Sequence, residues 1–155
     1  GQGARYYHDV VGCNSRLDAL QAAILDIKLK HLDEYIAARR KAADFYDNAF
    51  ANNKKITTPF RDANNKHVFH QYTLLVEGVN RDALHQFLAD NAVPSMIYYP
   101  VPAHRQKMFD AFGGSNYNLP VTDWLTGRVI SLPIHTELDE EQLNYICSNV
   151  LEFLS

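Results

Sequence analysis

No proline or glycine occurs from residue 15 to residue 51, and this uninterrupted stretch is the feature that most constrains the fold. Leu17, Leu20, Ile24 and Ile27 recur in it at steps of three and four residues, which is the spacing of one face of an α-helix. At ~1.5 Å per residue, a helix over the whole stretch would be ~50 Å long. The pattern therefore predicts a long helix that reaches beyond one small compact body.

The apolar pattern of this helix changes face near residues 28–31. A second stripe continues where the first one fades, and it consists of Leu25, Leu29, Leu32, Ile36, Ala43, Tyr46 and Phe50. A helix with two successive apolar faces can pack on one body first and on another body afterwards. We therefore interpret residues 15–51 as a connector helix between domains, with Ser15 and Asp18 as a capping-box pair at its start.

Residues 52–155 alternate short strands and helices. Runs rich in β-branched and aromatic residues predict strands over 67–76, 93–99 and 129–132. Helical patterns and their start signals predict helices over 81–91, 106–112 and 120–127, and a closing helix that begins at residue 139. Three strands backed by amphipathic helices make a small α+β domain. The predicted fold class is thus α+β, a long N-terminal helix followed by a three-stranded sheet packed with helices.

Composition excludes several classes of function. The net charge is −3 with interspersed signs, so we expect no nucleic-acid partner. No apolar run approaches the ~20 residues that cross a bilayer, so we expect no membrane partner. Two distant cysteines in a chain of this size favour a reducing compartment, the cytoplasm. His67 and His70 would point to opposite faces of a strand, so we predict no metal site.

The segment from Tyr98 to Gln106 holds the first candidate site. Pro100 and Pro102 make a rigid extended turn at the end of a predicted strand, which would bring Tyr98, Tyr99 and His104 to one rim. Tyrosines and a histidine on such a rim can contact a polar ligand. The alternative is that the two tyrosines only pack and form hydrogen bonds locally.

The stretch before the long helix holds the second candidate. Ser15 can cap the helix, which leaves the amide of Asn14 free to join the helix N-terminus in binding an anion such as phosphate. Arg16 lies on the unfavourable side of the helix dipole, which suggests an acidic partner or an anionic ligand. The alternative for Asn14 is a part in the helix cap.

Five blocks in order, GCNSRLDALQAAIL, KLKHLDEYIAARRKAADFY, HVFHQYTLLV, MIYYPVPAHRQKMF and ISLPIHTELDEEQLNYI, resemble the C-terminal portion of the DegT/StrS-type nucleotide-sugar aminotransferases. The resemblance runs from about Tyr6 to Phe153. It implies the fold-type-I architecture, pyridoxal 5′-phosphate as cofactor, and a homodimer. It also implies transfer of an amino group, usually from glutamate, to a keto-sugar on a nucleoside diphosphate, for surface-polysaccharide or amino-sugar biosynthesis.

The resemblance assigns roles to the candidate residues. Asn14 matches the residue that reaches the cofactor phosphate of the neighbouring subunit, and Arg16 matches one that meets the sugar nucleotide or braces the loop. Tyr98, Tyr99 and His104 match residues that border the sugar-nucleotide pocket. The sequence departs from the commonest pattern at Cys13, where an aromatic residue is frequent, and at Tyr98, where histidine is frequent.

The resemblance also implies a Schiff-base lysine that precedes this region, and no lysine here lies in a similar setting; the lysines are 28, 30, 41, 54, 55, 66 and 107. We therefore expect residues 1–14 to be the remnant of a large-domain loop, no catalytic residue in this chain, and no transamination by the chain alone. The alternatives are a non-catalytic sugar-nucleotide-binding or regulatory module and, third, a structural or oligomerisation domain. We also expect the first stripe of the long helix to drive association.

Overall fold

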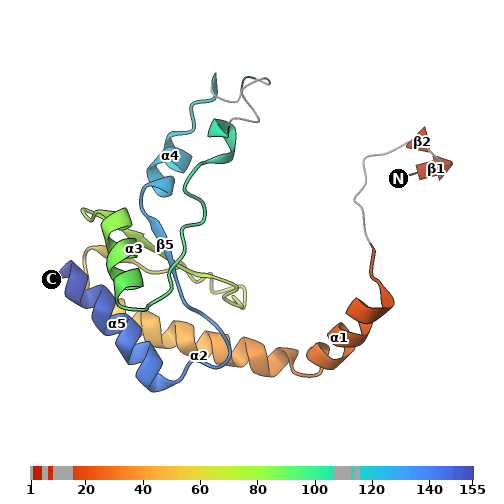
Figure 1. Cartoon of the computed structure of the whole chain (residues 1–155), viewed down its shortest axis with the longest axis horizontal. Helices are drawn as coiled ribbons and strands as arrows, with labels where there is room; N and C mark the ends of the chain where they lie inside the picture. Colours follow the sequence, from red (N-terminus) through yellow and green to blue (C-terminus); the bar gives the residue numbers. More distant parts are fainter. Residues whose placement is uncertain (1, 5–6, 9–15, 107–112, 114–115) are drawn as a thin grey trace. The chain divides into compact units, whose positions relative to one another are not determined.

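The computed structural model describes residues 2–4, 7–8, 16–106, 113 and 116–155, and the chain divides into two compact units, Gly1–Asp33 and Glu34–Ser155. Figure 1 shows the elements in chain order. The first unit contains an antiparallel pair of strands, β1 (Gln2–Ala4) and β2 (Tyr7–His8), and the helix α1 (Ala19–Leu29). Nearly all remaining elements belong to the second unit.

Helix α1 begins later than the sequence pattern predicts. Its N-cap is Asp18, whose carboxylate accepts a hydrogen bond from the backbone N–H of Gln21 at 2.8 Å. Asp18 is thus the capping residue itself, because its side chain satisfies one of the free amides of the first turn. Ser15, which was expected to cap the helix, lies outside the described residues.

The prediction of one uninterrupted helix over residues 15–51 is wrong. The structure has two helices, α1 and α2 (Leu32–Phe50), separated at Lys30 and His31. The backbone amides of these two residues donate to carbonyls only three positions back, those of Ile27 at 3.3 Å and Lys28 at 3.1 Å. Such a tightened turn ends an α-helical ladder without proline or glycine. It falls where the apolar pattern changes face, so the two stripes belong to two helices.

The second unit is built on a three-stranded antiparallel sheet with strand order β3-β4-β5. These strands are β3 (Ile56–Thr57), β4 (Tyr72–Val76) and β5 (Val129–Leu132). In the register, Ile56 pairs with Val76, and Leu74 pairs with Ile130. The three-stranded sheet is confirmed, and the strand predicted over 129–132 is β5. The strand predicted over 67–76 contains β4, and only the third strand differs from the prediction.

The segment 93–99 is not a strand, contrary to the prediction. It forms only an isolated bridge, in which Met96 and Ser131 exchange two backbone hydrogen bonds of 3.0 and 2.7 Å. Pro94 has no N–H to donate, so a longer ladder with β5 cannot form there. The third strand is instead the two-residue β3. The predicted strand over 67–76 is shorter at its start, since Phe69 has a φ of 48°, and regular pairing begins at Tyr72.

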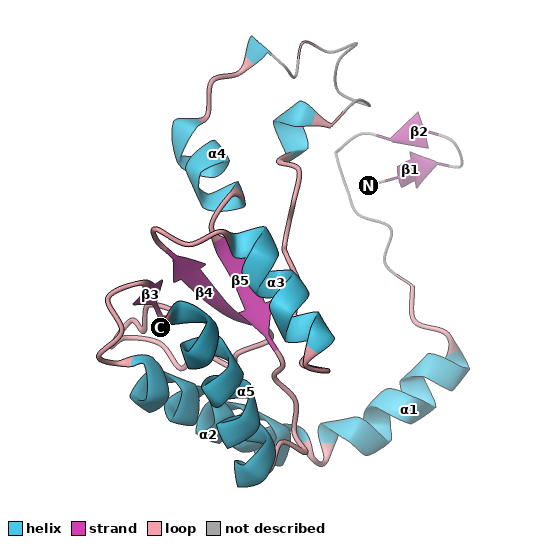
Figure 2. Ribbon diagram, turned by 60° about the vertical axis from the view of Figure 1, so that its left-hand side comes forward, coloured by secondary structure: helices cyan, strands magenta, loops and turns pink. Residues whose placement is uncertain are grey.

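The core lies on one face of this sheet. Tyr72, Leu74 and Val76 alternate with more exposed residues along β4 and are buried against α2, α3 (Arg81–Asp90) and α5 (Glu140–Leu154). Figure 2 shows β4 and β5 with these helices around them. In the core, the rings of Tyr46 and Tyr72 lie 4.9 Å apart between centroids.

The helix boundaries of this unit follow local signals in the sequence. The Asn80 side chain accepts from Ala83 N at 3.0 Å at the start of α3, and Asp139 and Gln142 form a capping box at the start of α5. Pro120 begins the short helix α4 (Pro120–Thr126), where its missing N–H costs no hydrogen bond. A 3₁₀ turn, η1 (Ala103–Arg105), follows the two prolines. Most of the predicted helix over 106–112 lies outside the described residues.

Among the described residues, none of the helices combines the length and the apolar character that a membrane crossing requires.

Candidate functional site

A cavity of about 510 Å³ lies between the segment 98–106 and the helix α4. One wall comes from the proline-containing segment, and the opposite wall comes from α4 and the first residue of β5. Its lining is mainly apolar, with a few hydroxyl and amide groups, and consists of Tyr98, Tyr99, Val101, Pro102, Ala103, Gln106, Thr122, Leu125, Thr126 and Val129. We refer to it as the α4 cavity. Mostly apolar walls with few polar groups are typical of small-molecule sites.

Two of the predicted site residues, Tyr98 and Tyr99, meet in the α4 cavity. Their rings are arranged edge to face, with centroids 5.6 Å apart and an interplanar angle of 68°. The side chain of Tyr99 is largely free of other contacts, since the residue is 71% exposed. Tyr98 also borders a smaller neighbouring cavity of about 230 Å³, together with His70 and Met96. The two phenol rings can therefore stack on a ligand or donate hydrogen bonds to it.

His104 lies beside the α4 cavity but is not part of its lining. Its side chain is only 8% exposed, and its Nε2 lies 3.5 Å from Oδ1 of Asp123. Within the described part of the chain, this buried nitrogen has no hydrogen-bond partner. The structure thus turns His104 toward α4, whereas Tyr98 and Tyr99 face the cavity.

Arg105, the next residue, makes the strongest polar contact between the two walls. Its Nε and one terminal nitrogen donate to the two carboxylate oxygens of Asp123 at 2.8 and 2.5 Å. These two hydrogen bonds hold the pKa of the Asp123 carboxyl below its usual value. The negative charge of Asp123 is therefore kept at neutral pH and joins η1 to α4.

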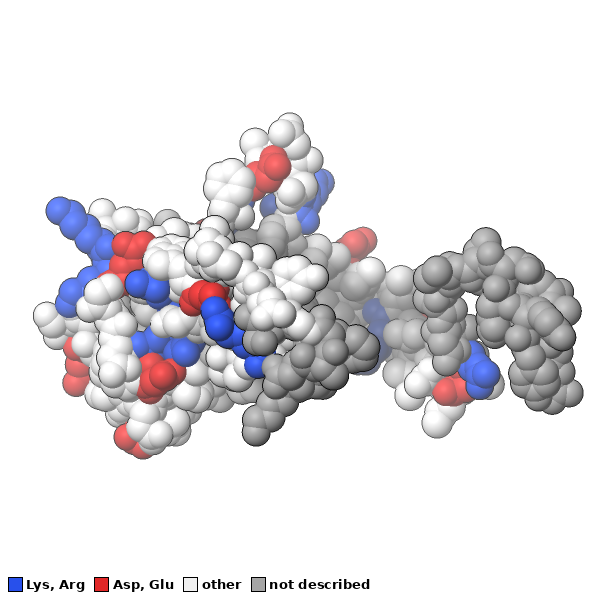
Figure 3. All heavy atoms as spheres, turned by 90° about the horizontal axis from the view of Figure 1, so that it is seen from above, with Lys and Arg blue, Asp and Glu red and all other residues white. Residues whose placement is uncertain are grey.

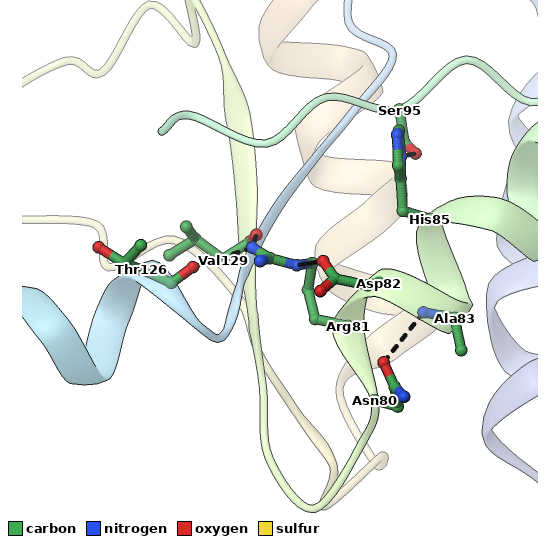
Figure 4. Close-up of polar contacts among 8 residues, drawn as sticks. All are labelled: Asn80, Arg81, Asp82, Ala83, His85, Ser95, Thr126 and Val129. Atoms are coloured by element: carbon green, nitrogen blue, oxygen red, sulfur yellow. Dashed lines mark hydrogen bonds and ion pairs between the residues drawn. The ribbon is translucent and has the colours of Figure 1, made fainter. Parts of the chain in front are cut away.

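A buried arginine, Arg81, holds the wall of the cavity that α4 and β5 form (Figure 4). Arg81 at the start of α3 is 7% exposed, and its guanidinium donates to the carbonyls of Thr126 at 3.0 Å and Val129 at 2.9 Å. Both acceptors belong to residues that line the cavity. The Arg81 Nε also donates to the carboxylate of Asp82 at 2.7 Å. Arg81 thus holds the junction of α4 and β5.

Sequence reasoning missed Arg81, Arg105 and Asp123. Arg105 lies in the block MIYYPVPAHRQKMF but received no role there, and Arg81 and Asp123 lie in none of the five blocks. Each of the three residues contacts a partner that is distant in the chain. The separation between Arg81 and Val129 is 48 residues, and that between Arg105 and Asp123 is 18. A residue before a helix or within a short helix reads as an ordinary solvated charge when its partner is unknown.

The two other predicted site residues, Asn14 and Arg16, belong to the first unit. Asn14 lies outside the described residues. Arg16 is exposed and precedes the N-cap of α1. The roles of both residues remain predictions.

Charge is dispersed around the cavity-bearing unit. Figure 3 shows acidic and basic side chains interspersed with uncharged ones over the face in view. No described lysine lines the α4 cavity. In the described parts of the chain, no group of three or more His, Cys, Asp or Glu side chains could hold a metal ion. The polar groups that the cavity offers are hydroxyls and one amide, which suit hydrogen bonding to a neutral, hydroxyl-rich ligand.

The fold defines a class, the small domain of fold-type-I sugar aminotransferases. The sequence profile of the DegT/DnrJ/EryC1/StrS aminotransferase family matches residues 1–151. The chain belongs to this family.

Three similar proteins show the range of the family. The chain is 40% identical over 155 residues to a protein of Geobacillus stearothermophilus named pleiotropic regulatory protein, covering 99% of the chain and 41% of that protein. It is 41% identical over 148 residues to the UDP-2-acetamido-2-deoxy-3-oxo-D-glucuronate aminotransferase of Pseudomonas aeruginosa, covering 96% and 40%. The crystal structure of S. venezuelae DesV in complex with a ketimine intermediate has a TM-score of 0.83 at 32% identity, covering 98% and 40%. The chain thus spans about two fifths of the length of these relatives.

Proposed function

We propose that the full-length protein containing this chain transfers an amino group to a keto-sugar carried on a nucleoside diphosphate, with glutamate as donor. The observation that carries this proposal is the α4 cavity, whose two tyrosines and three other polar residues lie in a chain that belongs to an aminotransferase family. The aminotransferase relative from Pseudomonas aeruginosa, whose name describes a UDP-linked 3-oxo sugar acid, supports this substrate class. The product serves surface-polysaccharide or amino-sugar biosynthesis in the cytoplasm.

The cavity suits the sugar part of such a substrate better than its phosphates. Hydroxyls of Tyr98, Tyr99, Thr122 and Thr126 can form hydrogen bonds with sugar hydroxyls, and the apolar wall can pack on the pyranose ring. Among the lining residues that the structure describes, none is a lysine or an arginine. We propose Arg16 as one contributor to the diphosphate site.

Pyridoxal phosphate, when bound, supplies the electron sink that amino transfer requires. The described residues do not form a set that would hold it, because the α4 cavity contains no cation for its phosphate and no amine for its aldehyde. We propose that Asn14 contributes to the phosphate site of a partner subunit in a homodimer, and that the lysine comes from a part of the protein outside this chain. On this proposal residues 1–14 belong to a large-domain loop and residues 52–155 to the small domain. The chain alone does not transaminate.

Incubation of the purified full-length protein with glutamate and a panel of UDP- and dTDP-linked keto-sugars tests the function. The expected result is an amino-sugar nucleotide by mass spectrometry together with stoichiometric 2-oxoglutarate. Asn14→Ala should weaken the affinity for pyridoxal phosphate, measured by equilibrium dialysis, while Asn53→Ala serves as a matched control. Absence of any amino-sugar nucleotide across the panel would overturn the proposed activity.

A second candidate is a sugar-nucleotide-binding or regulatory protein without catalysis. It is favoured by the relative from Geobacillus stearothermophilus, whose name is that of a regulatory protein and whose match covers nearly the whole chain. This candidate predicts that calorimetry detects binding of a nucleotide sugar by the full-length protein while no 2-oxoglutarate forms. Turnover with any member of the panel excludes it.

A further inference from the structure

The α4 cavity has two walls that are separate in the chain, and the carboxylate of Asp123 joins them through Arg105. Residues 98–106 make one wall, and α4 with Val129 makes the other. The carboxylate of Asp123 accepts two hydrogen bonds from Arg105, and it lies 3.5 Å from Nε2 of the buried His104. Two consecutive residues of η1 thus face one acidic side chain of α4.

The residues of this contact are direct neighbours of the cavity lining. Asp123 follows Thr122, and Arg105 precedes Gln106; both of these neighbours line the cavity. A change in the Arg105–Asp123 distance therefore moves lining atoms on both walls. We propose that Asp123 is a positioning residue that sets the width of the α4 cavity and so its affinity for the nucleotide sugar. This inference rests on the proposed function of the cavity.

The geometry of the contact makes it suitable for this role. Arg105 approaches with two parallel N–H groups, and such a bidentate pair fixes direction as well as distance. An exposed ion pair contributes little to global stability. With side chains 50% and 30% exposed, the pair acts on the placement of the segment more than on the folding of the unit.

Other contacts of the segment leave its outer part dependent on Asp123. The Met96–Ser131 bridge fixes the segment at its start. From residue 97 to 106, the described side-chain hydrogen bonds to elements outside the segment are the two that Arg105 makes with Asp123. The bond from Gln106 to the carbonyl of Val101 stays within the segment. We therefore expect loss of the carboxylate to loosen the described part of this wall around Arg105.

Asp123 is not among the described lining residues of the α4 cavity, so we expect its loss to act on substrate affinity and not on the chemical step. In the full-length protein we expect Asp123→Asn to raise KM for the nucleotide sugar roughly three- to tenfold, through misplacement of the wall. The KM for glutamate and kcat should stay within about twofold. Asp123→Glu keeps the charge and both oxygens and should restore most of the affinity.

The matched control is Asp44→Asn. Asp44 also accepts from an arginine, Arg61 at 2.6 Å, but it lies on α2 and outside the cavity lining. Its variant should leave both KM values unchanged. A second readout is hydrogen exchange by mass spectrometry over residues 98–106 in the full-length protein without substrate. Exchange there should be faster in Asp123→Asn than in the wild type, and unchanged in Asp44→Asn.

The outcomes separate the inference from the function on which it rests. Unchanged KM for the nucleotide sugar in Asp123→Asn overturns the positioning role, and so does an equal rise of both KM values with a lowered Tm, since that indicates general destabilisation. If the wild-type protein aminates no nucleotide sugar, the proposed function fails. The hydrogen-exchange data then test the positioning role of Asp123 without the activity assay. Unchanged exchange over residues 98–106 in Asp123→Asn overturns that role.

Discussion

The guanidinium of Arg81 donates a hydrogen bond to the carbonyl oxygen of Val129 at 2.9 Å, and this buried contact joins the start of α3 to the start of β5. The same guanidinium also donates a hydrogen bond to the carbonyl oxygen of Thr126 at 3.0 Å. A buried carbonyl that loses its partner costs about 1–3 kcal/mol. Arg81 thus contributes to the placement of α4 on the sheet.

Arg81→Leu should destabilise this junction by about 2–4 kcal/mol, because two acceptors lose their donor while the apolar volume is partly kept. Hydrogen exchange of peptides covering residues 124–132 in the full-length protein should be faster by the corresponding factor. Arg128→Leu is the control, since the Arg128 guanidinium contacts Trp124 on the preceding helical turn, donating to its carbonyl at 3.0 Å and lying over its ring. Equal exchange in the wild type and Arg81→Leu would contradict the assignment.

Tyr46→Phe should destabilise the second unit by about 1–2 kcal/mol. The Tyr46 hydroxyl donates to the carbonyl of Pro133 at 2.8 Å, and its ring is fully buried. Tyr145→Phe removes a hydrogen bond of similar length, 3.0 Å to the carbonyl of Asn91, at an exposed site and should cost less. Urea denaturation of the full-length protein, monitored by hydrogen exchange in β4, measures the loss of stability in both variants. A larger effect at Tyr145 would contradict the prediction.

Cys147 should be almost unreactive in the folded protein. Burial raises the pKa of its thiol to about 12, so the folded state holds roughly 10³-fold less thiolate than a free thiol at the same pH. Alkylation of Cys147 at pH 8.5, measured by peptide mapping, should therefore be slow in buffer. It should be complete in about 8 M urea, which unfolds most domains. Equal rates in the two conditions would contradict the buried placement.

The same pKa gives a direction for alkaline stability. The folded-state pKa lies above the unfolded value of about 8.5, so the neutral thiol stabilises the fold below that pH. This contribution is lost as the pH rises toward about 12. Cys147→Ala should accordingly show a smaller loss of stability between pH 8.5 and 11 than the wild type, by urea denaturation over these pH values.

The isolated chain should self-associate through α1. Leu17, Leu20, Ile24 and Ile27 are all exposed, Leu20 at 73%, and α1 has no buried residue. Exposed apolar stripes of this kind drive association. The double variant Leu20→Glu, Ile24→Glu should shift sedimentation of the isolated chain toward the monomer, whereas Ala19→Glu, Ala22→Glu adds equal charge away from the stripe and should not. A monomeric wild-type chain at high concentration would contradict this.

Local signals predicted the parts of the fold that depend on them. The closing helix was expected from Asp139, and the structure shows its capping box; α3 and α4 likewise begin where Asn80 and Pro120 indicate. The break at Lys30 and His31 was visible only as a change of apolar face, because no proline or glycine marks it. The two-residue β3 is too short to carry a periodic pattern, so it was missed.

The candidate site also has a part that local sequence signals predicted and a part that they did not. The proline turn predicted that Tyr98 and Tyr99 share a rim, and both line the α4 cavity. It did not predict that His104 turns toward Asp123, because that depends on the packing of η1 against a helix that follows later in the chain. Residues that act through distant partners leave no pattern in a single sequence.

The edge of β5 carries a consequence for how the protein behaves at high concentration. An open strand edge can recruit a strand of another molecule, and such pairing propagates into aggregates. Here the outward carbonyl of Val129 is occupied by Arg81, and the outward amide and carbonyl of Ser131 are occupied by Met96. Loss of Arg81 would uncover the Val129 carbonyl and leave the Met96 bridge as the remaining described cover of this edge.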